Sequence, residues 1–110
     1  MAKIDERIYE KILHLDSAID YQTESVVSQT LLAKETGTVT LFAFSEGEGL
    51  SEHTAPFDAM VQVIAGSVEI KISGKPYLLS TGDAIVMPGN KPHALKAVTA
   101  FKMLLIMIKS

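Results

Sequence analysis

Hydrophobic and polar residues alternate along most of the chain beyond residue 26, and this spacing is typical of β-strands. The clearest case is Ser67–Ile72, where three aliphatic side chains share one face while Glu69 and Lys71 share the other. The same criteria predict strands at residues 26–33, 38–44, 60–65, 67–72, 76–79, 84–87, 93–97 and 101–108. Short strands separated by turns, without a long helical pattern, predict an all-β fold: a small antiparallel β-barrel or jelly roll.

The first part of the chain gives an ambiguous signal. Ile8, Ile12 and Leu15 recur at helical spacing, but residues 11–15 also alternate as in a strand. We therefore expect residues 1–25 to form an N-terminal arm and residues 38–108 to form the barrel. A length of 110 residues predicts one domain.

The last predicted strand is apolar on both faces, so both should be buried. A thin barrel covers only one face of such a strand, which predicts a homodimer. In the alternative interpretation, the N-terminal arm covers the second face. The two faces carry Phe101, Met103, Leu105 and Met107, and Leu104, Ile106 and Ile108, respectively.

Composition narrows the function classes. A net charge of −3, with no cluster of basic residues, argues against nucleic-acid binding. The longest apolar run, Met103–Ile108, is too short to span a membrane. The chain has no cysteine, which excludes disulfides and thiolate sites and fits a cytoplasmic protein.

Two histidines follow glycines at regular distances, each close to a proline. Gly47 is followed by five residues and His53. Gly82 is followed by five residues and Pro88, and His93 comes five positions later. Joint spacing of this kind is more specific than either half alone.

This paired spacing resembles the double motif of the cupin superfamily, whose small β-barrels often bind a metal. The resemblance implies a jelly-roll barrel and metal ligands at four positions. Two of them are occupied here by His53 and His93, but the second histidine and the carboxylate fall on Ala55 and Ala59. The asparagine of the second motif falls on Ala97.

The remaining polar residues offer few replacements. Asp58 lies beside the vacant carboxylate position, and Gln62 is a polar residue in an apolar strand, so either is a possible third metal ligand. Gln62 faces away from the lumen unless a bulge shifts the register. Phe57, Met60 and Met87 are candidate pocket residues. His14 is interpreted as a surface or interface histidine without a role.

Three functions remain open at this point. The first is a small-molecule-binding protein that uses His53 and His93 in an apolar lumen, with no tightly bound metal. The second is a metal-dependent dioxygenase- or isomerase-like enzyme using Fe, Mn, Ni or Zn. The third is a dimeric interaction protein with a vestigial pocket.

Overall fold

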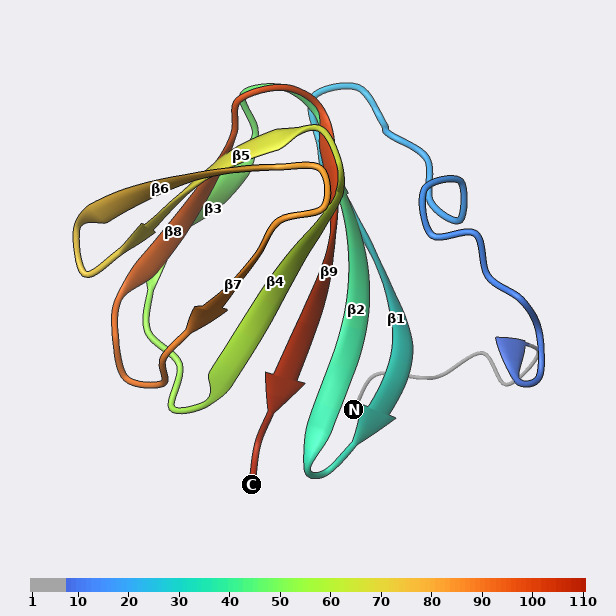
Figure 1. Cartoon of the computed structure of the whole chain (residues 1–110), viewed down its shortest axis with the longest axis horizontal. Coiled ribbons are helices and arrows are strands. Elements are labelled where there is room, and N and C mark those ends of the chain that lie inside the picture. The colour runs from blue at the N-terminus through green and yellow to red at the C-terminus, as the bar shows by residue number, and fades with distance from the viewer. Residues whose placement is uncertain (1–7) are drawn as a thin grey trace.

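The computed structural model describes residues 8–110, which form nine strands in two facing sheets (Figure 1). Within this range no helix has the length and apolar character needed to cross a bilayer. The strands are β1 (Val26–Lys34), β2 (Gly37–Phe44), β3 (Gly49–His53), β4 (Asp58–Ala65), β5 (Ser67–Ile72), β6 (Lys75–Ser80), β7 (Ala84–Met87), β8 (His93–Ala97) and β9 (Phe101–Ile108).

Five strands form one sheet in the order β1-β2-β9-β4-β7, and we name it sheet A. Four strands form the other in the order β3-β8-β5-β6, which we name sheet B. Every pair of neighbouring strands is antiparallel. The predicted all-β jelly roll is thereby confirmed.

The eight predicted strands are all present, with ends that differ by no more than two residues. Gly49–His53 was not predicted as a strand, because its sequence Gly-Leu-Ser-Glu-His lacks apolar alternation. Most of this strand is solvent-exposed, so burial does not impose a period of two on it. Its backbone pairing with β8 holds it in place.

The core fills the space between the sheets. Phe44 and Phe101 are fully buried and stack with ring centroids 4.5 Å apart. The alternating residues Val68 and Ile70 of β5 face them from sheet B and are also fully buried. Alternation along each strand therefore supplies one buried face per sheet.

Residues 8–25 cross the outer face of sheet A without forming a strand (Figure 1). Ile19 is buried there against Leu41 of β2, and Leu104 of β9 packs on the same cluster. The outer face of β9 is thus partly covered by the arm, as the alternative interpretation expected. Residues 1–7 of the predicted arm lie outside the described residues.

A buried lysine fastens this arm to the barrel. Lys102 of β9 is 8% exposed, and its ammonium donates a hydrogen bond to the main-chain carbonyl of Asp16. The same ammonium lies over the Tyr21 ring, 4.8 Å from the centroid. Partial burial raises the pKa of the Tyr21 phenol. Because a buried charge needs partners, these contacts fix the path of the arm.

Candidate functional site

A small cavity lies between the two sheets, and two histidines supply its polar surface. Its volume is about 50 Å³, room for a few water molecules. The other lining residues are apolar. The full lining is Leu50, His53, Ala55, Phe57, Ala59, Met87, His93, Leu95, Met103, Leu105 and Met107.

Strand pairing brings the two histidines together. His53 ends β3, His93 begins β8, and the two are paired across the ladder. The register shifts between Leu50 and His53, which is the mark of a bulge. The imidazole centroids lie 4.3 Å apart in an edge-to-face arrangement. The two residues that the motif spacing selected therefore share one site.

Each imidazole is oriented by a carbonyl two residues earlier. His53 Nδ1 lies 2.7 Å from the carbonyl oxygen of Ser51, and His93 Nδ1 lies 3.2 Å from that of Lys91. A carbonyl oxygen only accepts, so each Nδ1 carries the hydrogen. In the neutral rings, Nε2 is then the unprotonated nitrogen, available to a ligand or a metal.

The rings differ in their access to solvent. His93 is buried, with 7% of its surface exposed, whereas His53 is exposed. The cavity therefore has a wet side at the end of β3 and a dry side toward the core.

Two loops joined by hydrogen bonds form one rim of the cavity. The amide of Asn90 donates to the carbonyl of Ala55 at 2.7 Å, and the amide of Gly89 donates to Asp58 Oδ1 at 2.8 Å. Gly89 is packed so closely that an added Cβ would lie 3.1 Å from the backbone of Pro56. The segment that precedes His93 is thus held against the one that follows His53.

The two metal-ligand positions of the family motif that carry alanine in this chain lie in the cavity. Ala55 and Ala59 both line it, so methyl groups stand where the family motif has an imidazole and a carboxylate. Ala59 is buried, with 7% of its surface exposed. The cavity is apolar at these two positions because the residues that would make it polar are absent.

Neither predicted replacement reaches the cavity. Asp58 and Gln62 face the outside of sheet A, where the carboxylate of Asp58 holds the Gly89 amide and Gln62 is exposed. The register of β4 against β9 is continuous from Asp58 to Val63, and its shift comes only afterwards. The bulge that would have turned these side chains inward is therefore missing.

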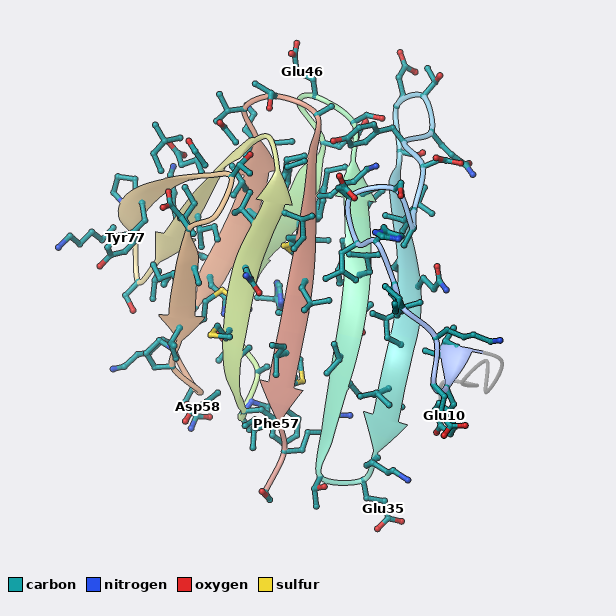
Figure 2. The ribbon with its side chains drawn as sticks, turned by 45° about the vertical axis from the view of Figure 1, so that its right-hand side comes forward. Glu10, Glu35, Glu46, Phe57, Asp58 and Tyr77 are labelled. Atoms are coloured by element: carbon teal, nitrogen blue, oxygen red, sulfur yellow. The ribbon has the colours of Figure 1, made fainter. Side chains whose placement is uncertain are left out.

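The predicted pocket residues divide in the same way. Phe57 and Met87 line the cavity, and Figure 2 shows Phe57 where the chain enters β4. The prediction that Met60 lines the pocket is wrong. Met60 lies two residues before Gln62 on β4, so both side chains are on the outer face of sheet A, where Met60 lines a groove. Leu50 and Leu95 also line the cavity, although no motif in the sequence points to them. Met103, Leu105 and Met107 belong to one of the two apolar faces expected for β9, and the structure shows that this face is the inner one.

The donor set can be compared with what a metal needs. Protein zinc sites use at least three protein ligands. Within residues 8–110, no group of three or more histidine, cysteine, aspartate or glutamate side chains is arranged to hold a metal ion. The cavity offers two imidazole nitrogens and otherwise apolar walls, so the described residues do not fit a firmly bound cation.

Comparison with known proteins agrees with this architecture. A family model described as the cupin domain matches residues 40–109. No curated protein sequence matches the chain.

Several solved structures are similar to the chain over most of its length. A conserved protein of unknown function from Streptococcus pyogenes is 35% identical, with a TM-score of 0.91 over 100% of this chain and 96% of that one. A cupin superfamily protein from Desulfitobacterium hafniense is 28% identical, with a TM-score of 0.90 over 99% and 100% of the two chains. A cupin 2 conserved barrel domain protein from Leptotrichia buccalis is 39% identical, with a TM-score of 0.85, covering 88% of this chain and 47% of that one. The sheet order, the motif spacing and the family match together place the chain in the cupin superfamily.

Proposed function

We propose that this cupin is a binding protein for a small organic acid, held by His53 and His93 without a tightly bound metal. The observation that carries the proposal is the pair of imidazoles at one end of an apolar cavity, each fixed through Nδ1. Both Nε2 atoms are left for a ligand.

Carboxylates suit this pair because an imidazolium ring carries a hydrogen on both nitrogens, so Nε2 can donate to a carboxylate oxygen while Nδ1 stays bonded to its carbonyl. A carboxylate has two oxygens that accept such bonds, and charge-assisted bonds are about twice as strong as neutral ones. The apolar walls would contact a short hydrocarbon tail.

The cavity limits the size and affinity of the ligand. A volume of about 50 Å³ is far below the ~300 Å³ or more of pockets for larger ligands. Acetate has four heavy atoms. At a ceiling of about 1.5 kcal/mol per atom its binding free energy reaches about −6 kcal/mol, a Kd no tighter than ~40 μM. We expect millimolar binding of acetate and propionate.

Metal-dependent dioxygenase or isomerase chemistry is a weaker candidate, because the cavity lacks a third protein ligand. We therefore assign no catalytic step to a metal at this site. The interpretation as an interaction protein with a vestigial pocket is tested by the same experiment.

The test is a thermal-shift and calorimetric titration with sodium acetate and propionate at pH 6 and constant ionic strength. We expect saturable stabilisation. The His53→Ala and His93→Ala variants should each lose it. His14→Ala is the matched control, since His14 is an exposed histidine of the arm.

Two results would overturn the proposal. One is a stabilisation that persists when both cavity histidines are replaced, since the acid would then bind elsewhere. The other is the absence of any saturable shift in the parent chain, which leaves the pocket without this use. A stoichiometric transition metal that is lost in His53→Ala would favour the metalloenzyme instead.

A further inference from the structure

An aromatic ring lies on the solvent side of the histidine cavity. Phe57 lines the cavity and is half-buried, in the loop that follows the exposed His53. Figure 2 shows Phe57 at the end of the barrel where β4 begins and β9 ends. Deeper lining residues, such as Met103 and Leu95, are buried. The ring therefore lies between solvent and the apolar part of the cavity.

A lysine side chain lies over this ring. The ammonium of Lys109 is 5.9 Å from the centroid of the Phe57 ring, within the range of a cation–π contact. Strand register accounts for the contact: Asp58 pairs with Ile108 at the end of the β4–β9 ladder, so the residues next to them are also neighbours across the strands. The amide of Lys109 donates to the carbonyl of Thr36 at 2.7 Å, which fixes the backbone of the lysine.

The backbone around Phe57 is anchored on both sides. The carbonyl of Ala55 accepts from the Asn90 amide, and the carboxylate of Asp58 accepts from the Gly89 amide. A Cβ at position 89 would lie 3.1 Å from the carbonyl carbon of Phe57, so the two loops are in close contact. A displacement of the whole loop would break these contacts, whereas a rotation of the Phe57 side chain alone would keep them.

We propose that the Phe57 side chain is a gate that sets the size limit of the ligand, and that Lys109 keeps it closed. This inference rests on the proposed function, the binding of an organic acid by the histidine pair. Acetate suits the closed cavity of about 50 Å³. An acid with a ring, such as benzoate, enters only when the Phe57 ring has rotated out of the cavity, which we name the open state. Phe57 thus determines specificity, and Lys109 is a positioning residue.

The strength of the lysine contact gives the size of the effect. A cation–π contact at an exposed site changes an equilibrium by about two- to fivefold. The apparent Kd of a ligand that binds only one state is inversely proportional to the population of that state. Removing the charge at position 109 should therefore raise the open population, and lower the Kd ratio of benzoate to acetate, by about two- to fivefold.

The first test measures that Kd ratio by NMR titration at pH 6 and constant ionic strength. Lys109→Met should lower the ratio about two- to fivefold, and Lys109→Arg, which keeps a cation over the ring, should retain the parent ratio. Phe57→Ala removes the gate and should lower the ratio by at least about tenfold. Lys75→Met is the matched control: the Lys75 ammonium lies 5.4 Å from the Tyr77 ring centroid on sheet B, away from the cavity.

The second test follows the gate without any acid. Diethyl pyrocarbonate modifies unprotonated imidazole nitrogens, and the modification of each histidine is measured by mass spectrometry of its peptide. His93 is 7% exposed, so its reaction requires the open state, whereas the exposed His53 is an internal reference. The rate at His93 relative to His53 should rise about two- to fivefold in Lys109→Met and more in Phe57→Ala, with no change in Lys75→Met.

The outcomes separate the gate from the proposed function. A Phe57→Ala variant with the parent Kd ratio and the parent rate at His93 overturns the gate. A Lys109→Met variant that behaves like Lys75→Met overturns the role of the lysine. If neither acid binds any variant but the His93 rates follow the expected order, the proposed function fails and the gate is supported.

Discussion

The alignment of the two histidines depends on a glycine four residues before His53. Gly49 pairs with Lys96 of β8, and a Cβ at position 49 would lie 2.0 Å from the carbonyl oxygen of Leu95. Side-chain carbons essentially never approach another atom within 3.0 Å, and here the neighbour is backbone. In a Gly49→Ala variant, β3 and β8 must therefore separate by at least about 1 Å.

The cost can be worked from these contacts. Overpacking of this kind costs about 1–3 kcal/mol, and a strained ladder bond next to it costs about 1 kcal/mol. The bond at risk runs from the amide of Ala97 to the carbonyl of Glu48, at 2.7 Å. We expect Gly49→Ala to lower the free energy of unfolding by about 2–4 kcal/mol and the Tm by about 8–16 °C. Acetate binding should fall with it, since His53 moves away from His93.

Gly47→Ala is the matched control. Gly47 has a φ of +83°, and an added Cβ there meets no atom within 4 Å. Its cost is conformational, about 1–2 kcal/mol, and the strand separation is unchanged. The assays are thermal unfolding and imidazole ¹⁵N NMR spectra. The reasoning is refuted if Gly49→Ala is no more costly than Gly47→Ala, or if its histidine signals match those of the parent chain.

Two further predictions concern the arm and the vacant ligand positions. Lys102→Met should free the arm by removing the bond to Asp16, lowering the free energy of unfolding by about 2 kcal/mol and speeding amide exchange around residue 16; the exposed Lys75→Met should do neither. The double variant Ala55→His, Ala59→Glu should bind Zn²⁺ stoichiometrically by metal analysis, unlike the parent chain, because both alanines line the cavity. A metal-free double variant would show that the two positions do not converge on the histidines.

Periodicity and motif spacing predicted the parts of the fold where each residue has a clear inside or outside. Alternation located β5, a continuous apolar run located β9, and glycine–histidine spacing located both His53 and His93. Periodicity did not predict β3, because most of its side chains are exposed and its sequence shows no alternation of apolar and polar residues. Strand pairing holds that segment, and pairing is a tertiary property.

The errors at the site have a different cause. Sequence parity alone made Gln62 face outward, and only a bulge near Asp58 would have reversed it. Bulges leave little trace in a sequence, so only the structure shows the register of β4 against β9. This register shifts after Val63, beyond both Asp58 and Gln62, and therefore does not turn their side chains inward. Met60 was misplaced for another reason: it was assigned to the pocket because it is apolar, although two-residue periodicity puts it on the same outward face as Gln62.

The size of the cavity could not be predicted from the sequence either. Its volume depends on how Met87, Met103 and Met107 pack around the imidazoles. Methionine fills irregular gaps with many conformations, so composition does not predict the space that remains.

Imidazole ¹⁵N NMR of the parent chain during an acetate titration at pH 6 tests the central claim most directly. The account predicts that the Nε2 signals of His53 and His93 shift together along one saturation curve, while those of His14 stay fixed. The Nδ1 atoms should remain protonated throughout, because each is held by a carbonyl. Unchanged Nε2 signals at saturating acetate, or equal shifts at all three histidines, would contradict it.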